Sequence, residues 1–333
     1  MGLKLGSIIP KKQIEFEDLK NKKIAVDASQ MLYQFISSIR QPDGTLLQDS
    51  NGNITSHLMG ISTRIPNLIQ KEIKPCFVFD GIPPKIKTQE QEKRRALKEA
   101  AKEKFEEAEE SGDESLMLKY SKQTSRVNKE MFEETKELLQ AFGLPILQAP
   151  SEAEAQCSYL AKNKDVDYVG SSDYDALLYE APLIVRNLTV SQRRKIGSSS
   201  VKIYPEIIEL KEVLEELKIS QEQLLILAIL TGTDYNPGGI KGIGPKKALK
   251  LIKENNNYDK IFKDLNPEFD WNEIYDTFKN MQVEKNSKLK WSPINKEKVK
   301  EILIERHEFN QERIEKMLSQ FKDNKNSSLD KWG

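Results

Sequence analysis

The chain has 333 residues, and its 52 basic and 52 acidic side chains give a formal net charge of zero. This balance excludes a protein that binds nucleic acid as a bulk polycation. The longest wholly apolar run, residues 224–230, is far shorter than the roughly 20 residues that a membrane span needs. We therefore expect a soluble intracellular protein.

The chain has only two cysteines and two histidines. Cys76 lies in an apolar run and Cys157 in a helical pattern, so we expect both to be reduced thiols in the core. His57 and His307 are too few, and too far apart along the chain, for a histidine-rich metal site. Any catalysis must therefore depend on carboxylates, on lysine or arginine, or on a metal ion.

Short β-branched or aromatic runs alternate with helical patterns, which predicts an α/β fold with a mostly parallel central sheet and helices on both faces. In such sheets a ligand binds outside the carboxyl ends of the strands. Acidic residues recur at these ends, because Asp27, Asp80 and Asp173 each follow a predicted strand. The six predicted strands are residues 23–26, 76–79, 145–147, 166–169, 183–185 and 201–204.

A long charged stretch, residues 89–140, separates the second predicted strand from the third. Residues 85–104 carry eight basic and four acidic side chains, a local charge of +4. Such a stretch is most often a solvated helical hairpin. Because the insertion begins soon after Asp80, we instead favour a helical arch, about residues 84–132, over the carboxyl end of the sheet.

Residues 220–256 predict a helix, a glycine-rich turn and a second helix. Gly242 and Gly244 let the backbone approach a ligand closely, and the N–H groups that begin the second helix form a site for an anion such as a phosphate. A tight turn between packed helices is the plainer alternative. Binding to a DNA backbone is favoured by three lysines in the first turns of the second helix: Lys246, Lys247 and Lys250.

Pairs of acidic residues two positions apart occur at two further candidate sites. The first pair is Glu152 and Glu154, at the start of a predicted helix. In one interpretation both side chains reach past the helix start. In the other, Glu154 forms a capping box with Ser151. The second pair is Asp173 and Asp175, after a predicted strand. If the backbone there is extended, the two side chains point in the same direction. The alternative is an ordinary turn at the end of the strand.

One more acidic residue completes a set of candidate metal ligands. Asp234 follows an apolar helix, where a buried acid needs a partner. If the whole set converges, its mutual repulsion requires cations. Carboxylate oxygens suit Mg²⁺ or Mn²⁺, and two such ions can activate water against a phosphodiester. The seven residues are Asp27, Asp80, Glu152, Glu154, Asp173, Asp175 and Asp234.

Seven short motifs stand in one order and spacing: IAVDAS (24–29), YQF (33–35), SHLMG (56–60), VFDGIPP (78–84), APSEAEA (149–155), SDYD (172–175) and GIGPK (242–246). Together they resemble the flap endonucleases of the archaeal and eukaryotic kind, in the XPG-type family of structure-specific nucleases. The resemblance covers essentially the whole chain. It implies a metal-dependent enzyme that cuts 5′ flaps of branched DNA, with an associated 5′–3′ exonuclease activity, in Okazaki-fragment processing and DNA repair.

The resemblance also implies roles for individual residues. The seven carboxylates match a site for two Mg²⁺ ions, which Mn²⁺ can replace. Lys87 and Arg94 match arch residues that hold the scissile phosphate, and Tyr33 matches a residue on which a base stacks. The glycine-rich turn matches a helix-hairpin-helix type element that also binds K⁺. A pocket for a one-nucleotide 3′ flap, in which His307 stands where lysine is more usual, is matched by Thr55, Ser56, Phe309 and Arg313.

We expect a single nuclease domain over residues 1–323 and a flexible tail over residues 324–333. The tail resembles a sliding-clamp-binding peptide with Leu329 and Trp332 as contacts, although it ends in Gly333 where a second aromatic residue is expected. The expected partners are branched DNA and, through this weakened peptide, a PCNA-type clamp. We expect a monomer with no membrane partner, cytoplasmic if archaeal and nuclear if eukaryotic.

Two rival functions remain open. An RNA-directed 5′-nuclease is possible because the chemistry of carboxylates and Mg²⁺ does not itself select the sugar. A non-catalytic DNA-binding scaffold is the alternative from another class, but such a scaffold should have lost several of the seven acidic residues, and all seven positions are filled.

Overall fold

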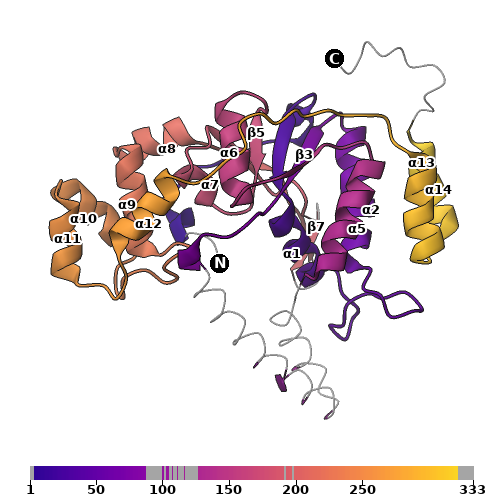
Figure 1. The fold of residues 1–333 in the computed structure, drawn as a ribbon, viewed down its shortest axis with the longest axis horizontal. Coiled ribbons are helices and arrows are strands. Elements are labelled where there is room, and N and C mark those ends of the chain that lie inside the picture. Colours follow the sequence, from indigo (N-terminus) through magenta and orange to yellow (C-terminus); the bar gives the residue numbers. More distant parts are fainter. Residues whose placement is uncertain are drawn as a thin grey trace.

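The computed structural model describes residues 4–87, 100, 103, 104, 107, 111, 116, 127–190, 193–196 and 199–321. A central sheet lies between layers of helices, with α10 and α11 at one end of the molecule and α13 and α14 at the other (Figure 1). Most of the predicted arch beyond Lys87 and the whole predicted tail lie outside the described residues.

Seven strands form the central sheet in the order β1-β9-β6-β5-β2-β3-β4. Neighbouring strands from β6 to β4 run parallel, whereas β9 is antiparallel to β6 and β1 is antiparallel to β9. This confirms the mostly parallel sheet predicted from the sequence. The strands are β1 Lys12–Gln13, β2 Lys23–Asp27, β3 Lys74–Phe79, β4 Ile146–Gln148, β5 Tyr168–Gly170, β6 Leu183–Arg186 and β9 Glu206–Glu209.

Alternate residues of β2 face two separate hydrophobic clusters, so both faces of the sheet are covered. Ala25 belongs to a cluster with residues of α6, α7 and α9, whereas Ile24 and Val26 belong to a cluster with residues of α1, α2 and α5. The helices of the first cluster are α6 Ala153–Lys162, α7 Asp175–Leu178 and α9 Gln221–Thr231, and those of the second are α1 Ala28–Ser38, α2 Ser56–Gln70 and α5 Lys129–Ala141.

The remaining helices extend both clusters toward the ends of the molecule (Figure 1). The first cluster gains α8 Leu210–Leu217, α10 Pro245–Glu254, α11 Tyr258–Leu265 and α12 Trp271–Lys279. The second gains α13 Lys296–Lys300, the π-helical segment η3 Glu301–Arg306 and α14 Gln311–Ser319. Trp291, in the segment between α12 and α13, packs against both clusters and donates a hydrogen bond of 2.9 Å to the carbonyl of Pro75. Two short 3-10 helices near the N-terminus are η1 Lys4–Ser7 and η2 Phe16–Leu19.

After its polar first turn, the apolar helix α9 is buried on all sides. Every residue from Leu224 to Thr231 is at most 5% exposed, which explains why this helix has no polar face. Its N-terminus is closed by a capping box between Ser220 and Gln223. Within the described parts of the chain, no helix is long and apolar enough to cross a membrane.

The two cysteines are core residues, as predicted. Cys76 in β3 and Cys157 in α6 are both free thiols and at most 1% exposed. Burial raises the pKa of the Cys76 thiol to about 12, and burial also raises the pKa of Cys157. Because both thiols stay protonated, neither is a nucleophile in this fold.

The sixth predicted strand, residues 201–204, is wrong as a member of the central sheet. The structure places Ser199–Lys202 in strand β8, which pairs with β7 Arg193–Ile196 in a separate two-stranded sheet. Val201 is 48% exposed there, whereas Ile208 of β9 is fully buried. Both segments have β-forming residues, and burial against the rest of the fold decides which one joins the sheet.

Candidate active site

The end of β2 presents Asp27 and continues directly into α1. The Asp27 carboxylate accepts a hydrogen bond of 2.9 Å from the backbone N–H of Gln30 and so caps α1. Asp27 is only 8% exposed. This cap holds the carboxylate at the carboxyl edge of the sheet, where the sequence placed it.

Asp80 ties the end of β3 to the start of α6. Its carboxylate accepts a hydrogen bond of 2.8 Å from the N–H of Ala153, the first residue of α6. The Gly81 N–H donates a hydrogen bond of 2.6 Å to the Ser151 carbonyl, and a Cβ at Gly81 would lie only 2.1 Å from the Ala149 carbonyl oxygen. Only glycine permits this approach, which holds Asp80 beside the first turn of α6.

The first turn of α6 carries Glu152 and Glu154. Glu152 stands at the N-cap position without capping the helix through its side chain, and Glu154 accepts a hydrogen bond of 3.0 Å from Ser171 Oγ. Ser151 Oγ donates instead to the Ile82 carbonyl, over 2.9 Å. The capping-box alternative is therefore wrong, and both glutamates present carboxylates at the helix start.

β5 ends in a turn that carries Asp173 and Asp175. Tyr174 between them has φ −98° and ψ −1°, and Asp175 is the first residue of α7. The extended-spacing alternative is wrong because the chain enters a helix soon after β5 ends, so the turn alternative is correct. Asp173 accepts a hydrogen bond of 3.0 Å from Gln30 Nε2, and Asp175 is 6% exposed.

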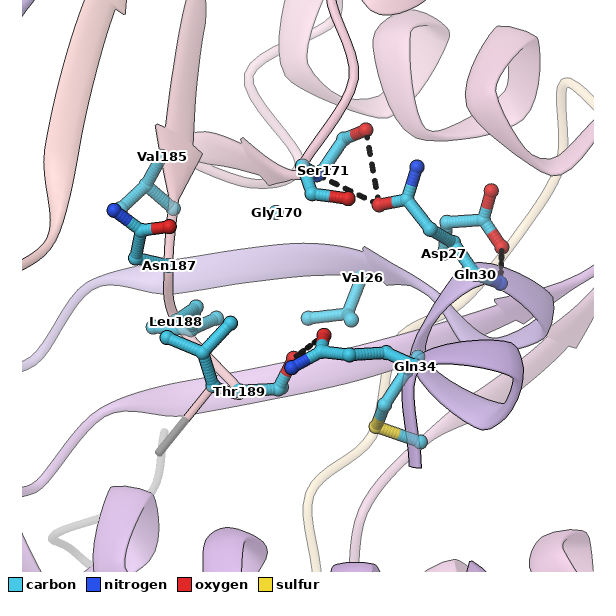
Figure 2. Close-up of a pocket in the computed structure, with 13 residues that line it drawn as sticks. Val26, Asp27, Gln30, Gln34, Gly170, Ser171, Val185, Asn187, Leu188 and Thr189 are labelled. Atoms are coloured by element: carbon cyan, nitrogen blue, oxygen red, sulfur yellow. Dashed lines mark hydrogen bonds between the residues drawn. The ribbon is translucent and has the colours of Figure 1, made fainter. Parts of the chain in front are cut away.

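Gln30 joins the ends of β2 and β5, although it was not among the site residues predicted from the sequence. Besides its bond to Asp173, its Oε1 accepts hydrogen bonds of 2.6 Å from the Ser172 N–H and 3.2 Å from Ser171 Oγ. Figure 2 shows its side chain reaching from α1 toward Ser171. Gln30 follows Asp27 by three positions, and an amide at that helical spacing is the signal that could have found it.

A crevice lined by both polar and apolar residues lies beside Asp27, at the ends of β2, β5 and β6 (Figure 2). It contains about 310 Å³ of empty space, part of it open to solvent. Gln34 Oε1 accepts a hydrogen bond of 3.1 Å from Thr189 Oγ1 there, and the Asn187 amide donates to the Tyr204 carbonyl over 3.1 Å. These amides and hydroxyls extend the polar surface next to the acidic residues.

Lys87 reaches into the acidic set. Its Nζ lies 2.6 Å from Glu152 Oε2 and 3.6 Å from Asp234 Oδ2, and only 16% of its side chain is exposed. Burial opposes the charge of the ammonium, but Glu152, Asp234 and Asp80 more than offset this effect and raise the pKa of Lys87. The segment after β3, the start of α6 and the loop after α9 therefore meet at this lysine.

Four members of the acidic set have a raised pKa, caused first by burial and then by the charges of neighbouring carboxylates. Burial raises the pKa of Asp27 well above its usual range, and the charge of Asp80 adds to the effect. Burial likewise raises the pKa of Glu154 well above its usual range, with Asp175 adding to it. Such mutual effects require that the carboxylates lie close together. Burial raises the pKa of two more members of the set, Glu152 and Asp173.

The chemistry of this set fits a divalent cation. Its members offer the hard carboxylate oxygens that Mg²⁺ and Mn²⁺ prefer, and buried like charges need compensation. Within the described ranges, no three Asp, Glu, His or Cys side chains are drawn together tightly enough to hold an ion. A bound cation would therefore have to draw the carboxylates inward and compete with the Lys87 ammonium.

The predicted helix, glycine-rich turn and helix over residues 220–256 include α9 and α10. Gly242 has φ +81°, a conformation that favours glycine. Among the residues that the structure describes, a Cβ at Gly242 or Gly244 would meet no atom within 4 Å, so these glycines face open space rather than a packed helix. α10 begins at Pro245 with no side-chain cap, and its first turns expose Lys246, Lys247 and Lys250. This geometry favours the anion site over the plain turn.

Comparison with known proteins identifies the family of this chain. Two family models match it, the XPG N-terminal domain over residues 1–101 and the XPG I-region over residues 143–234. Flap endonuclease 1 of Pyrococcus furiosus is 46% identical over 338 residues, which cover 100% of this chain and 99% of that protein. The chain belongs to the flap endonuclease family. Flap endonuclease 1 of Thermococcus onnurineus is likewise 46% identical, with the same coverage of both chains.

Solved structures agree with this assignment to the flap endonucleases. Flap endonuclease-1 from Methanococcus jannaschii superposes with a TM-score of 0.77 at 43% identity, covering 96% of this chain and 97% of that chain. The catalytic core of Rad2 in complex with DNA substrate has a TM-score of 0.73 at 24% identity, covering 96% and 99%, which shows a shared fold. The resemblance inferred from the motifs is confirmed, and membership of the family suggests a divalent metal cofactor.

Tyr33 of this flap endonuclease chain lies on α1 near the acidic set. Its side chain is 42% exposed. Burial of the rest of the ring, and then the charge of Asp80, raises the pKa of the phenol, which places Tyr33 close to Asp80. An exposed aromatic ring beside the carboxylates is available for stacking.

The segments of the predicted flap endonuclease 3′-flap pocket also meet. Glu308 accepts hydrogen bonds from the Ser50 N–H (2.9 Å) and Ser50 Oγ (2.5 Å), which joins the loop before α2 to the segment before α14. The Oγ of the buried Ser56 accepts a hydrogen bond of 2.9 Å from the Leu47 N–H. The four predicted pocket residues lie on these segments and on α14: Thr55, Ser56, Phe309 and Arg313.

Three predicted flap endonuclease residues lie outside the described residues: Arg94, Leu329 and Trp332. Lys87 is the last described residue before the gap in which Arg94 falls. The roles of these three residues stay predictions.

Proposed function

We propose that the chain is a structure-specific 5′-flap endonuclease that hydrolyses phosphodiester bonds of branched DNA. The observation that carries the proposal is the set of seven carboxylates at the carboxyl edge of the sheet, contributed by five segments, with Lys87 in contact with two of them. The flap endonuclease relatives, similar over the whole chain, support it.

The proposed cofactors are two Mg²⁺ ions, which Mn²⁺ can replace. Glu154, Asp173 and Asp175 would lie nearest the ions, and their carboxyl groups lie among other acidic side chains. Asp27 and Asp80 each already accept a hydrogen bond from a backbone N–H, that of Gln30 and that of Ala153, and would act partly through water. When bound, such ions supply a Lewis acid for the phosphate and lower the pKa of water to make a nucleophile.

The chain's own cations would bind and orient the reacting phosphate. The Lys87 ammonium lies at the edge of the acidic set, where it can donate hydrogen bonds to a phosphate oxygen. Arg94 on the predicted arch would add a second cation. Both would stabilise the negative charge that develops during hydrolysis. Tyr33 would stack on the base next to the scissile bond.

The α9–α10 turn would hold the duplex away from the site of cleavage. Gly242 and Gly244 face open space, and the exposed lysines of α10 stand beside the N–H groups of the helix start. Such a site binds phosphates and carries no sequence information, which matches specificity for DNA structure. A K⁺ ion bound through carbonyl oxygens of this turn is part of the proposal.

The remaining parts of the proposal concern partners. An arch over residues 84–132 would admit a single strand with a free 5′ end, and the tail at residues 324–333 would bind a PCNA-type clamp weakly. The protein would act as a monomer with one nuclease domain over residues 1–323. Neither an RNA-directed nuclease nor a non-catalytic scaffold is favoured, because the curated relatives are named flap endonucleases.

A substrate panel tests the proposed activity. Purified protein with Mg²⁺ is given five labelled substrates: a 5′ flap, a 5′ flap with a one-nucleotide 3′ flap, a single strand, a bubble and an RNA-containing flap. We expect rapid cleavage near the base of the two DNA flaps and little cleavage of the single strand or bubble. Preferential cleavage of the RNA-containing flap would favour the RNA-directed alternative instead, and binding without any cleavage would favour the scaffold.

A further inference from the structure

The chain's two histidines meet on one glutamate. His57 Nε2 lies 3.0 Å from Glu134 Oε2, and His307 Nε2 lies 3.0 Å from Glu134 Oε1. The two rings are far apart along the chain but meet in the fold, because α5 packs against both α2 and α13, which leads into the segment before His307. Among the described residues these side chains do not form a metal site. They form a hydrogen-bonded chain.

His307 faces a carboxylate at each ring nitrogen. Its Nδ1 lies 3.1 Å from Asp49 Oδ2, while its Nε2 contacts Glu134. A neutral imidazole has one N–H donor, so only the doubly protonated imidazolium can donate to both acids. The hydrogen bond with Glu134 raises the pKa of His307 despite its partial burial, and Asp49 adds to the effect. The two rings differ in this respect, because within the described part of the chain His57 Nδ1 has no hydrogen-bond partner.

The four side chains are held in a largely closed environment. The side chains of His57 and Asp49 are 0% exposed, that of His307 is 5% exposed, and that of Glu134 is 28% exposed. Burial alone would raise the pKa of Glu134, but hydrogen bonds from His307 and His57 lower it to about 2. An imidazolium between two such carboxylates makes charge-assisted hydrogen bonds, which are roughly twice as strong as neutral ones.

Other charged groups nearby are already paired with one another. Arg306 forms ion pairs with Glu137 and Glu301, and Lys298 contacts the same two glutamates. Glu308 accepts hydrogen bonds from Ser50. The groups that face the His307 ring are therefore Asp49 from the loop before α2 and Glu134 from α5, with His57 of α2 behind Glu134.

The same segments carry the predicted 3′-flap pocket. Thr55 and Ser56 lie between Asp49 and His57 in the sequence, and Phe309 follows His307 by two positions. Asp49 also organises its loop, because its Oδ1 accepts hydrogen bonds of 3.0 Å and 2.8 Å from the N–H groups of residues 51 and 53. α5, which carries Glu134, is the helix that follows the predicted arch. The His307 ring therefore connects the segments of the predicted 3′-flap pocket to α5, the helix that follows the predicted arch.

We propose that the His307 imidazolium is a positioning residue, which locks the loop before α2 onto α5 and so sets the affinity of the 3′-flap pocket. The proposal rests on the proposed flap endonuclease function. Only 5% of the His307 side chain is exposed, and both of its ring nitrogens face carboxylates of the protein. It acts by fixing Asp49 and Glu134, and through them the segments that carry Thr55, Ser56 and Phe309.

The two hydrogen bonds from His307 to Asp49 and Glu134, here called the lock, depend on pH in a definite direction. When His307 loses a proton, it can donate to only one of its two carboxylates, and the other then faces a lone pair of the ring. Because the pKa of His307 is raised, the lock is fully formed below the ordinary histidine pKa of about 6.5 and opens as pH rises through the higher value of the folded protein. Recognition of the one-nucleotide 3′ flap should weaken in that window.

Nuclear magnetic resonance tests the lock without DNA. Because the chain has two histidines, protein labelled with ¹⁵N-histidine gives signals from two rings, and His307→Gln assigns them. We expect the His307 ring to carry protons on both nitrogens and to titrate above the ordinary histidine range. A His307 ring that titrates at or below about 6.5 would overturn the proposal.

DNA binding tests the positioning role. With Ca²⁺ in place of Mg²⁺, the affinity for a 5′ flap is compared with and without a one-nucleotide 3′ flap from pH 6 to pH 9. The preference for the 3′ flap should fall roughly tenfold in the wild type, in line with the loss of a charged hydrogen bond. His307→Lys keeps a positive charge over this range and should keep the preference, whereas His307→Gln should lack it at every pH. His57→Gln, the matched control on the same glutamate, should keep the wild-type profile.

The outcomes separate this proposal from the proposed function. A protein that shows no preference for any flap, even at pH 6, contradicts the proposed function. A flap-specific enzyme whose 3′-flap preference has the same pH profile in wild type and His307→Lys overturns the positioning role alone. A 3′-flap preference that weakens as pH rises, and does so only in proteins that retain His307, supports the positioning role.

Discussion

Lys87 Nζ lies 2.6 Å from Glu152 Oε2, and both side chains are largely buried, at 16% and 12% exposure. The chain thus places one of its own cations among the carboxylates proposed to hold metal. Lys87 lies at the base of the predicted arch, whereas Glu152 begins α6. The contact therefore connects the position of the arch base to the charge of the acidic set.

Replacing Lys87 should have opposite effects on metal binding, which becomes tighter, and on cleavage, which becomes slower. Lys87→Met removes a positive charge from the acidic set, so we expect Mn²⁺ to bind about tenfold more tightly in calorimetry. Flap cleavage should nevertheless fall about a hundredfold, because a cation for the phosphate is lost. Lys162→Met is the matched control, since Lys162 makes an equally short ion pair of 2.6 Å with Glu180 away from the acidic set. Weaker Mn²⁺ binding by Lys87→Met would contradict this account.

The acidic set should destabilise the metal-free protein. Burial and Asp175 raise the pKa of Glu154, so its negative charge is unfavourable in the fold. Glu154→Gln should increase the free energy of unfolding in EDTA at pH 7, because it removes this unfavourable charge, and should abolish cleavage. Glu297→Gln, at a side chain that is 85% exposed on α13, should change neither property. A Glu154→Gln protein that is less stable than wild type would contradict the claim that the Glu154 charge destabilises the metal-free fold.

The histidine network should contribute to stability in a pH-dependent way. The raised pKa of His307 means that its contribution is fully present below about 6.5 and is lost as pH rises through the folded-state value. His307→Gln should therefore lower the free energy of unfolding by about 1.5–3 kcal/mol at pH 6, and the difference from wild type should narrow by pH 9. Urea unfolding at both pH values measures this, with His57→Gln retaining the wild-type pH dependence. A constant difference across this range would exclude a titrating lock.

The lysines of α10 should contribute to DNA affinity through salt-dependent contacts. Lys250→Ala should weaken binding to duplex and flap DNA alike, and should reduce the slope of log affinity against log salt by about one. Lys211→Ala is a close control, because both lysines are highly exposed, at 73% and 78%, and each pairs with a glutamate four residues on. Equal effects of the two substitutions in fluorescence anisotropy would argue against an anion site at the turn.

The position of the acidic site was predictable because its signals are local. Apolar runs followed at once by aspartate mark the ends of β2 and β3, and these ends form the carboxyl edge of a parallel sheet. Five of the six predicted strands lie in that sheet, so the side on which the carboxylates gather followed from the sequence.

Features that depend on packing were not predictable in the same way. The sixth strand was misplaced because the burial of Ile208, rather than β propensity, selects β9. The contact between Lys87 and Glu152 and the meeting of His57 with His307 join residues far apart in the chain. Such pairings arise from the way the helices pack, and no short motif encodes them.

The central claim is that the acidic set is the catalytic site of a metal-dependent flap nuclease. The most direct measurement is single-turnover cleavage of a 5′ flap by Asp175→Asn in Mg²⁺, together with its affinity for the same DNA in Ca²⁺. Asp175 is 6% exposed and its charge contributes to the raised pKa of Glu154. We predict that cleavage is abolished while DNA affinity stays within a few-fold of wild type. Cleavage at the wild-type rate would contradict the assignment of the site.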